Sequence, residues 1–382
     1  MRIAFVHSFY GSGQPSGENG VVQSEIEALS RAGHRVELFA ARTDELESAP
    51  GYRVTSALRV ATGRGRSPLG GIRAFAPHVV HVHNLFPNFG RRWATELRVP
   101  LVATLHNYRP LCVNGFLFRQ GHVCTLCPQG RPFAGVRHAC YRGSRMASLP
   151  QALANRGGPR ADPLLRRADR VVVLSRASAR LYRDAGVDQA KLVVWPNFLS
   201  ADLDPGPMET GKDPSGWLYV GRLSPEKGIL RLVERWPADR PLQIVGDGPE
   251  SDSIRKAATG KRVEVLEAVG RSAVLRLMRS AVGMVFPSAW FESFPLVYAE
   301  AMAAGLPVLA WEPNVVAELV RTDGTGTRTT WKEDLAGTLA RAEMDFPDLR
   351  VQCRRVFDRQ YSEAAYLVRA EALYQELADV SA

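Results

Sequence analysis

Short runs of β-branched and aliphatic residues alternate with segments of helical periodicity along nearly the whole chain. In the first half these runs lie at residues 3–6, 36–39, 79–82, 101–105, 171–174 and 192–195. In the second half they lie at residues 218–220, 242–245, 263–266, 282–286 and 308–310. Such alternation is typical of βαβ units around a parallel sheet. It predicts an α/β fold with two doubly wound domains in series.

A polar stretch rich in proline and glycine, residues 198–216, interrupts this alternation and reads as an inter-domain linker. We therefore place an N-terminal domain at residues 1–197 and a second domain at residues 198–361. The N-terminal domain carries an irregular insertion, residues about 108–145, that holds most of the chain's cysteines. In doubly wound folds, ligands bind at the carboxyl ends of the strands.

The charge balance limits the classes of binding partner but does not select one of them. Lys and Arg number 49 against 39 Asp and Glu, a net charge of +10, which suits an anionic ligand, an anionic membrane surface or nucleic acid. Because no Lys/Arg run or nucleic-acid reader motif is present, we expect no nucleic-acid partner. The first residues are a strand and not a signal peptide, and no apolar run reaches about 20 residues. A cytoplasmic location is the expectation.

The stretch from residue 286 to residue 309 predicts strand, loop, helix, turn and strand. Pro295 suits the first helical position, so the amides of Leu296 and Val297 and the helix dipole would form an anion site. Glu292 precedes this site, and Glu300 follows it in the helix. Two carboxylates flanking one anion site suit a diphosphate that carries a sugar at each end.

A second cationic element follows the strand at residues 218–220. Arg222 and Lys227 lie five residues apart, one at the strand end and one near a helix start, so both can point at one diphosphate. A strand end with a glycine turn, Ile244-Val-Gly-Asp-Gly-Pro249, lies in the same domain.

The first strand ends in a glycine-containing loop. Gly11 and Gly13 suggest a dinucleotide fingerprint, but Ser16 stands where that fingerprint needs Gly or Ala, which argues against NAD. The alternatives are a surface loop, or a backbone approach to a ligand at Gly17 to Gly20. His83 and His106 each follow a strand, at the ligand-binding end of the sheet.

The cysteines of the insertion, Cys112, Cys124, Cys127 and Cys140, include one C-x2-C pair. Four thiolates could hold a structural zinc ion that orders the insertion. Disulfides or a redox pair are the alternatives, and a reducing compartment counts against disulfides.

Several of these motifs resemble one family, the retaining GT-B glycosyltransferases of glycosyltransferase family 4. Glu292 and Glu300 match its E-x7-E motif, and residues 221–228 match its G-R-x-x-x-E-K-G element. The resemblance implies the GT-B fold, with two Rossmann-like domains facing a central cleft. In that family the last helix, here within residues 362–382, often crosses back to the N-terminal domain.

The resemblance also implies an activity: transfer, with retention, of a sugar such as a hexose from a nucleoside-diphosphate sugar to a hydroxyl acceptor. The acceptor stays open between a glycan, a lipid-linked glycan at a membrane surface and a small metabolite such as an aminocyclitol. A sugar-nucleotide epimerase or hydrolase that acts without an acceptor is the alternative. Pro295 stands where many members have Gly, so their donor preference does not transfer.

By resemblance, Glu292 would hold the donor sugar, Glu300 the ribose, and His106 would lie beside the bond being broken. The donor-binding set would be Gly20, Gly221, Arg222, Lys227, Gly246, Asp247, Phe294, Leu296, Val297 and Glu300. Asn19 and His83 would lie on the acceptor side. Catalysis would need no cofactor, and the only metal expected is the structural zinc.

Overall fold

A computed structural model describes residues 1–12, 17–206 and 215–381 of the chain. These residues form two compact units, which we treat one at a time. The first unit contains Met1–Leu117, Cys124–Pro196 and Leu367–Ala382. The second unit contains Phe118–Val123 and Asn197–Tyr366. Gly13 and Ser16 of the rejected dinucleotide fingerprint, and residues 207–214 of the expected linker, lie outside the described residues.

The first unit is built on a six-stranded parallel sheet of order β2-β1-β3-β4-β7-β8, as far as the described residues show. Its strands are β1 (Arg2–Phe9), β2 (Arg35–Arg42), β3 (Val79–Asn84), β4 (Leu101–Leu105), β7 (Arg170–Val173) and β8 (Leu192–Val194). The central strands β1, β3 and β4 are buried almost throughout because helices cover both faces of a doubly wound sheet.

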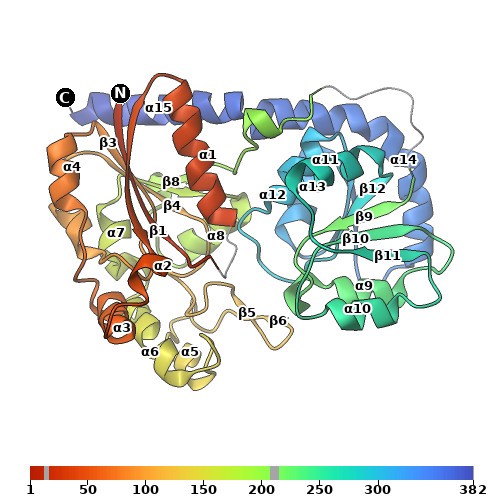
Figure 1. The fold of residues 1–382 in the computed structure, drawn as a ribbon, viewed down its shortest axis with the longest axis horizontal. Coiled ribbons are helices and arrows are strands. Elements are labelled where there is room, and N and C mark those ends of the chain that lie inside the picture. Colours follow the sequence, from red (N-terminus) through yellow and green to blue (C-terminus); the bar gives the residue numbers. More distant parts are fainter. Residues whose placement is uncertain (13–16, 207–214, 382) are drawn as a thin grey trace. The chain divides into compact units, whose positions relative to one another are not determined.

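Helices connect these strands (Figure 1). They are α1 (Gly17–Arg31), α2 (Thr43–Leu46), α3 (Tyr52–Thr62), α4 (Leu69–Phe75), α5 (Ala134–Arg137), α6 (Arg145–Asn155), α7 (Pro163–Arg167) and α8 (Arg176–Asp184). Helix α15 (Glu363–Ser381) begins in the second unit, and its residues from Leu367 onward belong to the first. Tyr374 of α15 is fully buried and bonds to His81 of β3, with 2.7 Å between Oη and Nδ1.

The second unit repeats the plan with a six-stranded parallel sheet of order β11-β10-β9-β12-β13-β14 within the described residues. Its strands are β9 (Trp217–Val220), β10 (Leu242–Val245), β11 (Val263–Leu266), β12 (Gly283–Phe286), β13 (Val308–Trp311) and β14 (Gly326–Thr329). Its helices are α9 (Ile229–Arg235), α10 (Ser251–Ala257), α11 (Arg271–Ser280), α12 (Leu296–Ala303), α13 (Val315–Asp323) and α14 (Leu335–Val356).

The α/β fold predicted from the sequence is confirmed, and every expected strand range falls on a strand. Three strands were not expected: β14 at a sheet edge, and the two-residue strands β5 (Phe118–Arg119) and β6 (His122–Val123), which pair as a hairpin inside the cysteine insertion. Among the described helices, none combines the length and the apolar character needed to cross a bilayer.

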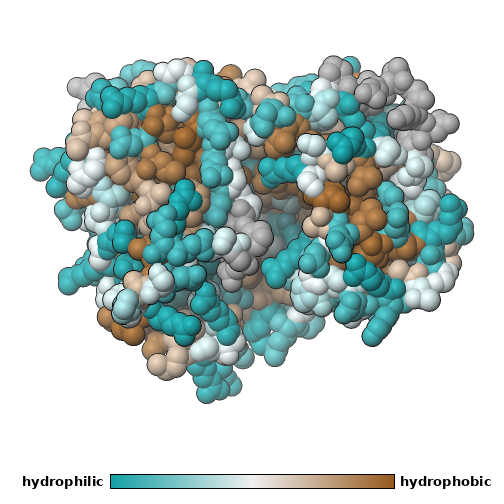
Figure 2. All heavy atoms as spheres, viewed as in Figure 1, coloured by the Kyte–Doolittle hydropathy of each residue, from teal (hydrophilic) through white to brown (hydrophobic). Residues whose placement is uncertain are grey.

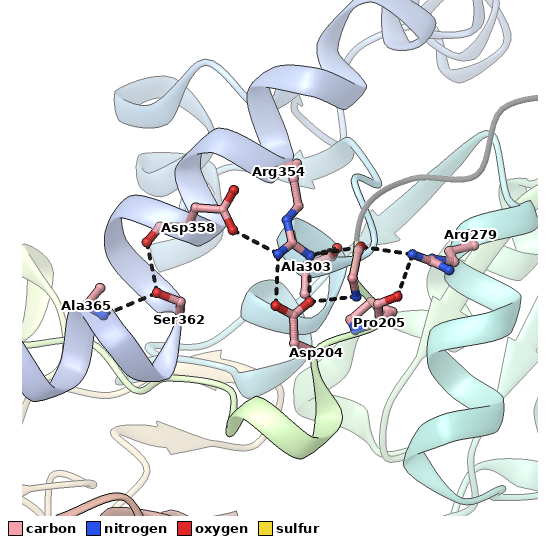
Figure 3. A network of polar contacts seen from close by, with 9 residues as sticks. Asp204, Pro205, Arg279, Ala303, Arg354, Asp358, Ser362 and Ala365 are labelled. Atoms are coloured by element: carbon pink, nitrogen blue, oxygen red, sulfur yellow. Dashed lines mark hydrogen bonds and ion pairs between the residues drawn. The ribbon is translucent and has the colours of Figure 1, made fainter. Parts of the chain in front are cut away.

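An ion-pair network fixes the chain where it enters the second unit (Figure 3). Arg354, near the end of α14, binds both oxygens of Asp204, at 2.6 and 2.8 Å, and also binds Asp358 at 2.9 Å. Burial alone would raise the pKa of Asp204, but Arg354 and its neighbours lower it overall. Arg279 of α11 donates to the carbonyl oxygens of Pro205 and Gly206, at 2.7 and 2.9 Å. These contacts tie the entering segment to two helices of its own unit.

Candidate active site

The loops after β9 and β12 carry the cationic and acidic motifs of the second unit. Strands β9 and β12 are neighbours in the sheet, so the loops that leave their carboxyl ends meet. After β9 the chain turns through Gly221 and exposed Arg222 into a short 3₁₀ turn, η5 (Pro225–Lys227). Lys227 thus lies at the end of that turn, and Gly228 alone separates it from helix α9.

Glu292 is a buried carboxylate that several donors contact. It is 5% exposed, and its Oε1 lies 2.6 Å from Nζ of Lys227. The Ser288 hydroxyl and the Trp290 indole N–H donate to the same oxygen at 2.7 and 3.0 Å. Lys227 also lies 5.5 Å from the centre of the Trp290 ring, within cation–π range. Three donors therefore hold one carboxylate in a single orientation, and two of them, Ser288 and Trp290, were not predicted.

Glu300 lies on helix α12 and is 6% exposed. Burial raises its pKa, and the guanidinium of Arg271, 3.0 Å away, offsets part of that rise. Arg271 was not predicted from the sequence. A signal existed, because a cation at the first position of α11 opposes the helix dipole and so suggests a partner elsewhere.

The helix start differs slightly from the prediction. Pro295 is the residue before α12, with extended backbone angles (φ −79°, ψ 124°), and Leu296 is the first helical residue. Leu296 and Val297, whose amides were predicted to face an anion, form the first turn and are partly exposed. Phe294 is 6% exposed and packs against Tyr361, with 5.4 Å between ring centres.

The glycine turn after β10 lies against the β9 loop. A Cβ atom on Gly246 would lie 1.9 Å from the carbonyl oxygen of Gly221, so only glycine fits there. The amide of Leu223 donates to the carbonyl of Asp247 at 2.9 Å. The structure thus brings the backbones of Gly221, Arg222, Gly246 and Asp247 together, and their role in donor binding stays a prediction.

Four of the eight histidines gather in the first unit near the carboxyl end of its sheet. His83 and His106 stack, with 2.9 Å between Nδ1 and Nε2. Burial, followed by the positive charges of His7 and His81, lowers the pKa of His106 to about 3. His106 is therefore neutral at physiological pH, which suits a hydrogen-bonding role beside the reacting bond.

The second contact of His83 is to Glu25 of helix α1, which lies 3.5 Å from Nε2 and was not predicted. Glu25, His81 and His83 are the one group of three potential metal ligands within 4.8 Å of one another among the described residues. Both ring nitrogens of His81 are hydrogen-bonded, to Tyr374 and Thr104. We therefore interpret these three side chains as a polar cluster of the protein core and not as a set of metal ligands.

Asn19 of α1 hydrogen-bonds to His7, with 3.0 Å between Oδ1 and Nε2. Gly20 has open space where a Cβ atom would be, so no packing requires glycine there. The resemblance had assigned Gly20 to the donor and Asn19 to the acceptor side.

The four insertion cysteines are present as free thiols. Cys112 donates to the Asn114 side chain, 2.9 Å away. Burial, with the nearby Cys112 and Cys140 sulfurs, raises the pKa of Cys127 to about 11. Within the part of the chain that the structure describes, no three of these sulfurs lie within 4.8 Å of one another. The sulfur atoms would have to move towards one another to bind a single zinc ion, so the structural zinc stays a prediction.

Two family models match the chain. One described as Glycosyltransferase Family 4 covers residues 16–203, and one described as Glycosyl transferases group 1 covers residues 207–355. Glycogen synthase of Mycobacterium tuberculosis is 28% identical over 305 residues, or 75% of this chain and 65% of that enzyme. The chain thus matches just under two thirds of that relative's length.

Several solved structures resemble the whole chain, and two of them serve as examples. Sucrose-phosphate synthase from Thermosynechococcus elongatus has a TM-score of 0.66 at 19% identity and covers 98% of each chain. HepE of Anabaena in complex with UDP has a TM-score of 0.59 at 18% identity and covers 98% of this chain and 100% of that one. At such identities, the likeness shows the fold. Together with the family models, it shows that the chain is a glycosyltransferase of family 4 type with the GT-B fold.

Proposed function

We propose that the enzyme transfers a sugar, with retention, from a nucleoside-diphosphate sugar to a hydroxyl acceptor. The observation that carries the proposal is the 2.6 Å contact between Lys227 and Glu292. It joins two motifs 65 residues apart in the chain, one predicted to hold the diphosphate and one the donor sugar. That HepE of Anabaena was solved with UDP adds support for a nucleotide donor.

The proposed roles follow the chemistry of the departing diphosphate. Arg222, Lys227 and the amides at the start of α12 would stabilise the negative charge that grows on it. We expect no divalent-cation requirement, because these groups supply positive charge. Glu300 would hold the ribose hydroxyls and Glu292 those of the donor sugar.

In the proposed step the acceptor oxygen bonds to the anomeric carbon on the face from which the diphosphate leaves. The bond between that carbon and the phosphate oxygen breaks, and the acceptor proton passes to the departing diphosphate. His106, neutral at working pH, would hydrogen-bond beside this centre. No atom of the chain becomes covalently attached.

The acceptor alternatives remain a glycan, a lipid-linked glycan and a small metabolite. Support for a membrane-bound acceptor comes from the net charge of +10 and from exposed apolar residues on α3, Val54 at 63% and Leu58 at 59%. Figure 2 shows hydrophobic side chains at the edge of the first unit where Figure 1 places α3. Sedimentation with anionic lipid vesicles tests this contact, and failure to sediment would favour a small acceptor.

Calorimetry with UDP, GDP, dTDP and ADP tests donor binding. Combining Arg222→Gln with Lys227→Met should weaken binding of the preferred nucleotide at least about a hundredfold, since each charge-assisted contact is worth about 1.5–3 kcal/mol. Arg255→Gln, an exposed residue of α10, is the matched control and should bind normally. Unchanged affinity in the double variant would place the diphosphate elsewhere. With an acceptor in hand, the anomeric configuration of the product, read by NMR, tests retention.

A further inference from the structure

The first unit contains a pocket that the proposed roles leave largely unused. It offers about 80 Å³ of space between the ends of β3 and β4 and helices α3, α6 and α7. Its walls are mainly apolar, and His83 and His106 are among the residues that line it. Its other polar lining includes Arg59, Arg91, Arg109, Asn84, Asn107 and Gln151.

Arg109 is the least satisfied cation of this pocket. Its guanidinium stacks on Phe86, with 3.9 Å to the ring centre, so the plane of the group is fixed. Its Nε and Nη1 atoms are buried and have no hydrogen-bond partner among the described residues. A buried donor without a partner carries a desolvation cost, which a bound acceptor atom would recover.

Arg59, on helix α3, also has a buried guanidinium nitrogen without a hydrogen-bond partner among the described residues. Its Nη1 donates to the carbonyl of Pro87 at 3.2 Å, whereas its buried Nε has no partner among the described residues. Burial lowers the pKa of Arg59, and the positive charge of Arg66 lowers it further. The third arginine is different, because Arg91 is paired with Asp162.

The charges around the pocket do not cancel. Asp162 is the one carboxylate in the described lining, and Arg91 already neutralises it. His106 is uncharged at neutral pH. Outside the lining, Glu18 faces Arg109, but burial raises the pKa of Glu18 to about 8, so the negative charge of this carboxyl is disfavoured. Arg59 therefore has no carboxylate partner in the described lining, and Arg109 has only Glu18, whose charge burial suppresses, and a hydrogen bond with Tyr10.

We propose that this pocket binds an anionic group, a phosphate or a carboxylate, carried by the acceptor. That the bound molecule is the acceptor depends on the proposed transferase function. That the pocket binds an anion does not depend on it. Arginine forks match the oxygens of both groups. The space is about half that of a 150 Å³ cavity known to take benzene, so it suits one such group and not a sugar ring. The next atoms of the bound molecule would lie beside His106.

The test is calorimetric titration with methyl phosphate and, separately, with acetate, using the full chain. Arg59→Gln and Arg109→Gln should each weaken binding of the preferred anion at least tenfold. Arg53→Gln, an exposed residue on the same helix as Arg59, should bind as the wild type does. The tighter of the two titrants indicates whether the pocket prefers a phosphate or a carboxylate.

Methyl phosphate could also occupy the proposed diphosphate site, so Lys227→Met is titrated in parallel. Loss of binding in Lys227→Met alone, equal binding in the two pocket variants, or no binding of either anion by the wild type would overturn the proposal. Circular dichroism and nucleotide binding confirm that Arg109→Gln is folded. If no nucleotide binds the wild type but methyl phosphate binding still depends on Arg109, the anion site stands and the proposed transferase function fails.

Discussion

The contact between Lys227 and Glu292 yields a quantitative prediction about stability. Lys227→Met keeps the length of the side chain and removes its charge, and Glu292→Gln keeps the shape of the carboxylate. The side chains are 20% and 6% exposed, so the carboxylate is the more buried partner. Removing the lysine thus leaves a buried negative charge, whereas removing the carboxylate leaves an ammonium that can still reach water.

These exposures set the magnitudes. Losing one partner of a fully buried pair costs about 3–5 kcal/mol. Because Glu292 keeps the donors Ser288 and Trp290, we expect a smaller cost for Lys227→Met, about 2–3 kcal/mol, within the range of a charge-assisted hydrogen bond. Glu292→Gln should cost about 1–2 kcal/mol and the double variant about as much as Lys227→Met alone. The coupling energy would then be about 1.5 kcal/mol.

Hydrogen exchange of the β9 and β12 amides is the appropriate assay, since a chain with two units need not unfold in one step. The two single variants, the double variant and the wild type form a complete double-mutant cycle. Salt should change the coupling little, because the pair is shielded from solvent ions. A coupling below about 0.5 kcal/mol, the value of an exposed ion pair, would refute the reasoning.

Three further predictions concern other parts of the molecule. Glu300→Ala should reduce the preference for a ribonucleoside diphosphate over its 2′-deoxy form about tenfold; equal discrimination in calorimetry would remove Glu300 from the ribose. His81, whose pKa burial lowers to about 3 from its usual 6.5, contributes stability that is fully present above pH 6.5 and is lost as the pH falls towards 3. In His81→Gln, the fall of unfolding free energy with decreasing pH should therefore be shallower by about 1.4 kcal/mol per pH unit, and an unchanged slope in hydrogen exchange of the β3 amides at pH 4–6 would contradict this. Elemental analysis of the purified protein should find about one zinc per chain if the insertion cysteines close a site, and a folded, metal-free protein would retire that reading.

The strands were predictable because strands buried on both faces of a parallel sheet are continuous aliphatic runs. β14 escaped prediction because Gly326-Thr-Arg-Thr329 is a polar run at the sheet edge, where one side needs no cover. β5 and β6 were not predicted because a strand of two residues is too short to show a periodic pattern. The sequence therefore determined the layers of the fold better than its edges.

Part of the site was predictable for a topological reason. Lys227 and Glu292 follow strands that are neighbours in the sheet, so a strand-end rule brings them together. The contact between Arg271 and Glu300 depends on how α11 and α12 pack, which no local pattern shows. The polar core around His81 depends on Tyr374, 293 residues away in the chain, and periodicity carries no information at that separation.

The place of helix α15 has a consequence for how the protein is made. Ala370, Leu373, Tyr374 and Leu377 are buried, and from Leu367 onward the helix belongs to the first unit. A ribosome therefore completes the whole second unit before it releases the residues that cover the first. At about 5–20 residues per second, the first unit would wait on the order of ten to thirty seconds without the contact between His81 and Tyr374. During that interval the second unit is free to begin folding, so the two units can complete their folding at about the same time.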